Sequence, residues 1–190
     1  MNLIGNSCIA SYITRDFLHQ KFVNPFCWCI MDFQSCYNLV KYWDSIDFNN
    51  FELIKDEDWN FSIIIDDKVK VQYVHYLFDK NATKIIKNPP DVKWNRIWEY
   101  IVEKYTIRVK NIKNEPPIFL FATANNGLIR HKHFTLEQQK MLDELNSPYK
   151  IIVSFKDVLN ETKNITCVKQ KDNYYDNGYK ISEFLYKESL

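Results

Sequence analysis

Short apolar runs alternate along this chain with longer segments in which apolar residues recur at helical spacing. Residues 2–5 predict a short strand, and the uninterrupted apolar runs 116–123 and 149–155 are typical of strands buried on both faces of a parallel sheet. Elsewhere, apolar residues recur every three to four positions, which predicts helices. These are a helix that starts after Asn6 or Ser7 and three more at 32–43, roughly 92–113 and 134–146.

Residues 61–76 predict a β-hairpin, because two β-rich runs flank the turn-prone residues 66–68. Side chains alternate between the two faces of a strand, so every second position of the second run shares a face. The residues that share it are Val69, Val71, Tyr73 and His75.

Capping residues support two of the predicted helices. Asp32 is placed to cap the helix at 32–43, and Thr135 with Gln138 forms a capping-box pattern. The apolar run 23–31 contains a proline and predicts a strand or an extended buried segment. The polar residues 156–190 predict one strand and a final short helix.

The order of these elements predicts an α/β fold. We expect a mostly parallel central sheet covered by helices on both faces, with the β-hairpin at about 61–76. A single domain spans 1–190, with a core at 1–155 and a polar extension at 156–190 that packs on it. Sites in such sheets form beyond the carboxyl ends of the strands, where Asn6–Cys8, His75 and residues 123–126 lie.

Composition narrows the function classes. The formal net charge of +1 gives no electrostatic reason to expect nucleic acid as a partner, and three glycines leave no room for Gly-rich nucleotide loops. No apolar run reaches the length of a membrane span and no signal peptide is recognisable, so we expect a cytoplasmic protein with its five cysteines reduced. We expect a small-molecule or glycan substrate and no cofactor, and the oligomeric state stays open.

Cys8 is the first candidate for chemistry. A cysteine in the first turn of a helix lies near backbone N–H groups that favour the thiolate and that can hold an oxyanion. A cysteine nucleophile needs this geometry. The alternative is that Cys8 is a small apolar residue packed under the sheet, as free cysteines often are.

His75 is the candidate base, because it lies near the end of a predicted strand. A histidine base needs an orienting acid, which Asp79 or the pair Asp66 and Asp67 would supply. The alternative is a structural histidine hydrogen-bonded to the backbone.

Arg108 falls within the apolar stripe of the helix at 92–113, between Ile97 and Ile101 on a helical wheel. A buried guanidinium must be paired, either with a carboxylate such as Asp66 or Asp79 or with an anionic ligand that it holds bidentately. The alternative is an arginine at a helix end whose charged group reaches water.

Cys27, Cys29 and Cys36 do not have the spacing of a zinc site, which usually combines two closely spaced pairs. Packing in the core accounts for them better, and no metal is expected. The basic segment at 130–133 is interpreted as a solvated loop.

Three segments resemble two related bacterial families, over roughly residues 1–125. They are IGNSCIASYI at 4–13, NPFCW at 24–28 and DDKVKVQYVHYLFD at 66–79. One family is described as papain-like cysteine peptidases, and the other is encoded in exopolysaccharide and capsule biosynthesis loci. The first usually has an acidic residue where this chain has Cys27.

The resemblance implies a surface-polysaccharide biosynthesis protein that acts as a cysteine-dependent acyltransferase or esterase. Its order of Cys, His and Asp is reproduced by the expected catalytic residues Cys8, His75 and Asp79. The residues expected to bind substrate are Asn6, Ser7, Trp28, Asp67, Arg108, Thr123 and Asn125.

Two alternatives remain open. The first is a glycosyl- or phosphoryl-transferring enzyme or a glycan-binding accessory protein, with an anion site around Arg108 and a structural Cys8. The second is an interaction protein without a pocket, since Trp and Tyr are enriched at protein interfaces.

Overall fold

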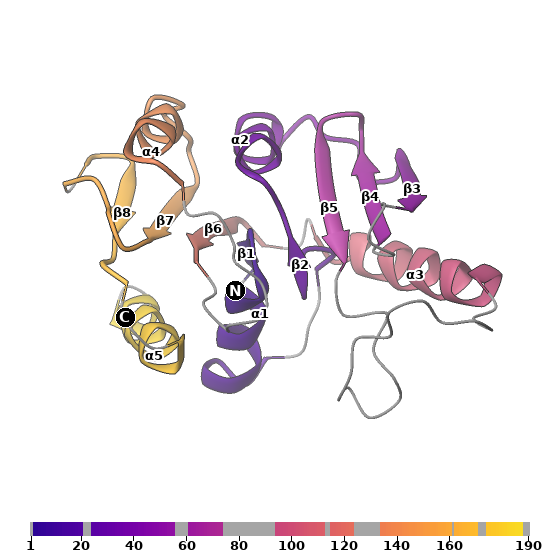
Figure 1. The fold of residues 1–190 in the computed structure, drawn as a ribbon, viewed down its shortest axis with the longest axis horizontal. Helices are drawn as coiled ribbons and strands as arrows, with labels where there is room; N and C mark the ends of the chain where they lie inside the picture. The colour runs from indigo at the N-terminus through magenta and orange to yellow at the C-terminus, as the bar shows by residue number, and fades with distance from the viewer. Residues whose placement is uncertain are drawn as a thin grey trace.

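The computed structural model describes residues 2–20, 24–55, 61–73, 94–112, 115–123, 134–160, 162–170 and 174–187. Within these residues the chain forms two four-stranded sheets and a set of packed helices (Figure 1). The α/β class is therefore confirmed. We expected one central sheet with the hairpin beside it. The structure instead has two sheets, and the hairpin is part of the second four-stranded sheet.

The first sheet is entirely parallel. Its strands, in spatial order, are β1 (Asn2–Gly5), β6 (Pro117–Ala122), β7 (Lys150–Ser154) and β8 (Ile165–Cys167). The register sets Ile4 beside Phe119 and Phe119 beside Ile151. Every described residue of β1 is buried, and so is nearly all of β6 and β7, which explains their continuous apolar sequences. The predicted strands at 2–5, 116–123 and 149–155 are confirmed.

Alternate residues of the parallel strands contribute to two separate hydrophobic clusters. Leu3, Leu120 and Ile152 belong to a cluster with the N-terminal helix and the C-terminal helix, whereas Phe119 and Ile151 belong to the larger cluster. Figure 1 shows α1 and α5 on one side of the parallel sheet and α2 and α4 on the other. The bounds of these helices are α1 (Cys8–Tyr12), which continues as the π-helix η1 (Ile13–Phe17), α2 (Phe33–Tyr42), α4 (Leu136–Asp143) and α5 (Tyr174–Lys187).

The second sheet is antiparallel, with the spatial order β2 (Cys29–Ile30), β5 (Val69–Tyr73), β4 (Phe61–Ile65) and β3 (Phe51–Lys55). Helix α3 (Trp94–Val109) packs beside it. Tyr105 of α3 lies 4.5 Å from Phe51 between ring centroids, and its hydroxyl donates to the Phe48 carbonyl oxygen at 3.0 Å. The larger hydrophobic cluster contains residues of both sheets and so joins them.

The hairpin prediction is confirmed over the described residues 61–73. Val69, Val71 and Tyr73 are buried, whereas Lys70 between them is exposed. Asp66 and Asp67 have φ angles of 50° and 52°, the positive values that both central residues of a type I′ turn adopt. The strand β3, which pairs with the other edge of this hairpin, was not predicted.

Both predicted helix caps are present. The Asp32 side chain accepts a hydrogen bond from the Ser35 backbone N–H at 2.7 Å. The Thr135 hydroxyl accepts from the Gln138 N–H at 3.1 Å, and the Gln138 side chain accepts from the Thr135 N–H at 3.0 Å. These bonds satisfy N–H groups that a helix start leaves unpaired.

The segment around Pro25 is a turn and does not form the predicted strand until Cys29. The buried side chain of Asn24 determines this course, because its Nδ2 donates to the Leu3 carbonyl oxygen at 3.1 Å and its Oδ1 accepts from the Phe26 N–H at 3.0 Å. Trp28 ends the turn with a φ of 59°. Of the described residues in this segment, Cys29 and Ile30 pair with β5.

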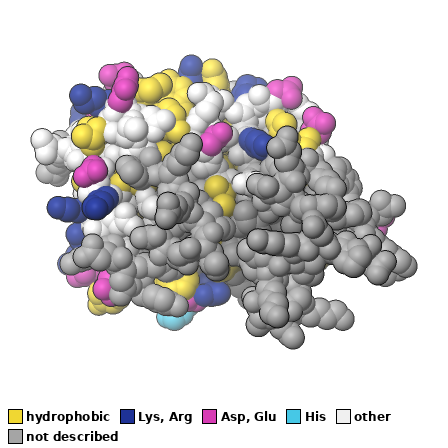
Figure 2. Space-filling view, viewed as in Figure 1, with side chains coloured by type: hydrophobic (Ala, Val, Ile, Leu, Met, Phe, Trp, Pro, Cys, Tyr) yellow, Lys and Arg dark blue, Asp and Glu magenta, His cyan; other side chains and the backbone are white. Residues whose placement is uncertain are grey.

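The described surface carries both signs of charge. Figure 2 shows Lys and Arg side chains interspersed with Asp and Glu side chains over the described part of that face, in keeping with the net charge of +1. Among the described helices, none combines the length and apolarity that crossing a bilayer requires.

Gly5 ends β1 where α1 packs most closely against it. A Cβ at Gly5 would lie 2.5 Å from the Ala10 Cβ and 3.0 Å from the Leu120 carbonyl oxygen. We predict that Gly5→Ala lowers the free energy of unfolding by about 1–3 kcal/mol, because backbone must shift to relieve the overlap. Urea unfolding measures this loss.

Gly178→Ala in α5 is the matched control. Its Cβ would meet the Phe17 ring at 3.2 Å, and that side chain can move. Alanine also stabilises a helix by roughly 0.5–1 kcal/mol relative to glycine. We expect a change in unfolding free energy of less than about 1 kcal/mol, and equal losses for the two variants would contradict the close packing at Gly5.

Candidate functional site

The candidate site lies at the carboxyl end of β1, where the chain turns into α1. Asn6 Oδ1 accepts a hydrogen bond from the Ala122 N–H at 2.9 Å, and Ser7 Oγ donates to the Ala122 carbonyl oxygen at 3.3 Å. The Asn6 carbonyl oxygen also accepts from the Met31 N–H at 2.9 Å. Asn6 and Ser7, which were expected to bind substrate, therefore attach the turn to the end of β6.

Cys8 is the first residue of α1, as the sequence predicts. The side chain of Ser7, at the N-cap position, makes no capping hydrogen bond because its hydroxyl is directed to Ala122. The first backbone N–H groups of the helix are therefore not satisfied by the residue that usually does so.

Burial dominates the acidity of Cys8. The residue is 4% exposed. Burial raises the pKa of the Cys8 thiol to about 12, and the Cys8 backbone N–H, which favours the thiolate, acts in the opposite direction with a smaller effect. The thiol is thus protonated at neutral pH in this structure, in contrast to the thiolate that its place at a helix start led us to expect.

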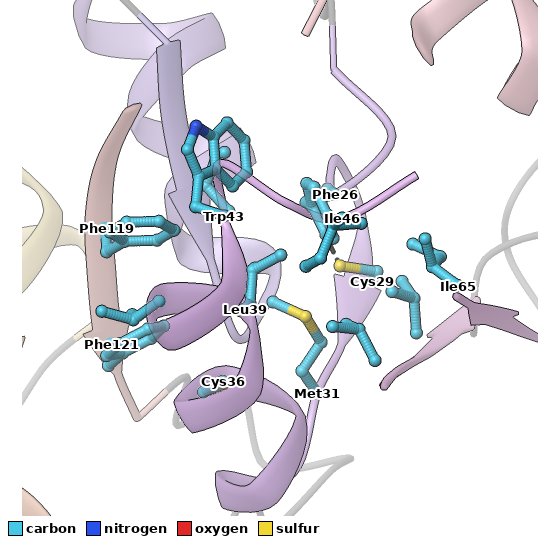
Figure 3. Packing of buried hydrophobic residues seen from close by; sticks show 14 of the residues in the cluster. Phe26, Cys29, Met31, Cys36, Leu39, Trp43, Ile46, Ile65, Phe119 and Phe121 are labelled. Carbon is cyan, nitrogen blue, oxygen red and sulfur yellow. Dashed lines mark hydrogen bonds between the residues drawn. The ribbon is translucent and has the colours of Figure 1, made fainter. Parts of the chain in front are cut away.

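Cys8 belongs to a group of buried thiols with Cys27, Cys29 and Cys36. Burial raises the pKa of Cys29 well above its usual value, the neighbouring Cys8 and Cys27 raise it further, and Arg108 lowers it. Figure 3 shows Cys29 and Cys36 within the hydrophobic cluster that also contains Met31. The described residues contain no group of three His, Cys, Asp or Glu side chains placed to hold a metal ion.

The carboxyl ends of β6 and β7 carry a second polar group. Ser154 Oγ donates to Asn177 Oδ1 of α5 at 3.1 Å, and Gln170 Nε2 donates to the Thr123 carbonyl oxygen at 3.3 Å. The Thr123 hydroxyl oxygen is buried and has no hydrogen-bond partner among the described residues. Thr123 was expected from the sequence, whereas Ser154, Gln170 and Asn177 were not.

The sequence contains a signal that could have identified Ser154 and Asn177. Ser154 is a polar residue at the end of a buried strand, and Asn177 is an amide on the buried face of an amphipathic helix. Buried polar groups need partners, so each predicts a hydrogen bond. The pairing of the two follows only from the fold.

Trp28 lies against the helical segment that starts at Cys8. Its backbone N–H donates to Ser11 Oγ at 2.7 Å, and its ring lies 5.2 Å from the Arg15 guanidinium carbon. Arg15 also contacts the Tyr12 ring at 5.5 Å and donates from Nη2 to Asp16 Oδ2 at 2.7 Å. This cation–aromatic contact beside the candidate site was not predicted.

Arg108 and Asp67, which were both expected to bind substrate, lie in different surroundings. Arg108 is half-buried in the last turn of α3 and flanks the buried stripe of Ile101, Tyr105 and Val109. Its positive charge lowers the pKa of the buried Cys29, against the larger effect of burial. Asp67 is exposed in the hairpin turn, at the opposite end of β5 from Tyr73, which pairs with Cys29.

His75, Asp79 and Asn125 lie outside the described residues, so their predicted roles stay predictions. The described residues bring Asn6, Ser7, Cys8 and Thr123 to one edge of the parallel sheet. Neither a search of protein-family models nor a search of curated proteins finds a match to this chain.

The arrangement can present one thiol beside helix-start N–H groups, on a turn that hydrogen bonds hold in place.

We predict that Asn6→Ala lowers the free energy of unfolding by about 1–3 kcal/mol, because the buried Ala122 N–H would lose its acceptor. The exposed Asn160→Ala is the control, with an expected change within about 0.5 kcal/mol. An equally small loss for Asn6→Ala in chemical denaturation would leave Asn6 available as a substrate ligand.

Proposed function

We propose that this protein is a cysteine-dependent acyltransferase or esterase of surface-polysaccharide biosynthesis, with Cys8 as the nucleophile. The observation that carries the proposal is the position of Cys8, which opens a helix directly after a buried parallel strand on a turn attached to β6. The substrate class rests on the resemblance of segments 4–13, 24–28 and 66–79 to the capsule-locus family.

The high pKa of the Cys8 thiol determines how such a reaction proceeds. A thiol that is protonated at rest has to lose its proton as the sulfur attacks, so the base acts during the attack and no stable thiolate precedes it. His75 is the proposed base and Asp79 its proposed orienting acid.

Each step of the proposed reaction moves one proton and exchanges one bond. Cys8 Sγ bonds to the carbonyl carbon of an ester or thioester while its proton passes to His75. The bond to the leaving alcohol or thiol then breaks, and that group takes the proton from His75. A sugar hydroxyl or water next bonds to the acyl carbon and gives its proton to His75, and the Cys8 sulfur leaves and takes that proton back. The N–H groups at the start of the helical segment 8–17 hold the oxyanion formed in between.

Because Cys8 is 4% exposed, acyl transfer also requires an opening step that brings the sulfur into contact with substrate. Closure of the site would then keep water away from the acyl-cysteine and favour transfer to a sugar hydroxyl over hydrolysis.

The experiment is acyl trapping. Brief treatment with p-nitrophenyl acetate, followed by peptide mass spectrometry, locates the acetyl group. We predict acetylation of Cys8 ahead of Cys167, the least buried of the five cysteines, because simple accessibility would favour Cys167. His75→Gln should slow the labelling of Cys8 by about 100-fold or more, as expected when a general base is removed.

Cys167→Ala is the control variant and should leave the acetylation of Cys8 unchanged. Acetylation confined to Cys167, with Cys8 unmodified in the folded protein, would contradict the proposal.

A second candidate function is supported by the charge of Arg108, which acts on the buried Cys29 from a half-buried position. In a glycosyl- or phosphoryl-transferring enzyme, or in a glycan-binding accessory protein, this guanidinium would bind a phosphorylated sugar and Cys8 would only pack. Glucose 1-phosphate would then bind to Cys8→Ala as to the original protein, and Arg108→Gln would abolish that binding.

A further inference from the structure

A cavity of about 320 Å³ lies at the amino ends of β6 and β7, at the edge of the sheet opposite to the end where Cys8 follows β1. Pro117 opens β6 and Tyr149 directly precedes β7, and both line the cavity. Its volume is within the range of small-molecule sites. The cavity is therefore separate from the candidate acyl-transfer site.

Three aromatic residues line this cavity, of which Tyr149 is half-buried and Trp43 and Phe48 are 8% and 2% exposed. The centroid of the Trp43 ring lies 5.2 Å from that of Phe48, with an interplanar angle of 62°. It lies 6.5 Å from the centroid of the Tyr149 ring, with an interplanar angle of 72°. Trp43 also packs on Phe119 at 5.5 Å, so its ring is held in the core. Steeply inclined rings make a corner for a compact group, whereas a sugar ring stacks on a flat aromatic face.

Two carboxylates complete the lining. Asp44 and Glu115 are both exposed, and none of the seven lining residues that the structure describes is Lys or Arg. The Tyr149 hydroxyl donates to Asp44 Oδ1, which orients that carboxylate. The same hydrogen bond raises the pKa of Tyr149, so the phenol stays protonated and neutral.

We propose that this cavity binds an organic cation that carries an alkylammonium group. The negative faces of the aromatic rings attract a cation, and the two carboxylates add charge complementarity. The group can belong to a small molecule such as a choline derivative or to a methylated lysine of a polypeptide. The proposal does not depend on the proposed acyl transfer, because it uses the other edge of the sheet.

The test compares a cation with its neutral isostere. Choline and 3,3-dimethyl-1-butanol have the same shape and differ in the charge of the central atom. In titrations followed by NMR of the tryptophan indole N–H groups, we predict that choline shifts one of them and binds at least about tenfold more tightly than the alcohol. Nα-acetyl-trimethyllysine amide is titrated in parallel, and binding of either cation supports the proposal while the tighter one identifies the source.

Charge variants locate the site. Asp44→Asn keeps an acceptor for Tyr149 but removes one charge, and Glu115→Gln removes the other. Each should weaken choline binding by about two- to fivefold, as expected for loss of an attraction between exposed charges, while Glu103→Gln on the exposed side of α3 should not change it.

Three outcomes would overturn the proposal. They are equal affinity for choline and the alcohol, a response to methyl glucoside in place of choline, and no response to choline up to about 10 mM, well above a dissociation constant of about 1 mM.

Discussion

The close approach of α1 to β1 at Gly5 is the constraint on which the candidate site depends. A side chain at this position would overlap Ala10 and the Leu120 carbonyl oxygen, so only glycine allows the helix to begin where it does. Asn6 and Ser7 then fasten the turn to both backbone groups of Ala122. The position of Cys8 is therefore determined by backbone packing and by two side-chain hydrogen bonds, before any catalytic partner is considered.

The same packing that positions Cys8 also suppresses its ionisation. A site in contact with water would let the helix start stabilise the thiolate, whereas here removal of water from the sulfur outweighs the contribution of the backbone N–H. The positive charge of Arg108 lowers the pKa of Cys29, so it favours an anion at that neighbouring thiol. A buried, protonated thiol suits a reaction that generates negative charge on the sulfur only transiently.

Sequence periodicity predicted most of the strands and helices because their apolar faces are long and their caps are explicit, as at Asp32 and Thr135. It did not predict β3, in which the charged Glu52 and Lys55 interrupt the apolar residues, or the turn at Pro25–Trp28, which depends on hydrogen bonds from the Asn24 side chain to the distant strand β1. It placed Cys8 correctly at a helix start. The depth of burial of Cys8 and the pair Ser154–Asn177 depend on how α5 and the sheets assemble, which a local pattern does not contain.

The most direct test of this account is the ionisation of the Cys8 thiol, followed by the pH dependence of its alkylation by iodoacetamide and peptide mass spectrometry. Because burial raises the pKa of the thiol to about 12, we expect the alkylation rate at Cys8 to keep rising with pH and to show no plateau below about pH 10. A plateau below the usual cysteine pKa of about 8.5, lost in His75→Ala, would contradict it. That result would show a preformed thiolate–imidazolium pair in place of a buried thiol.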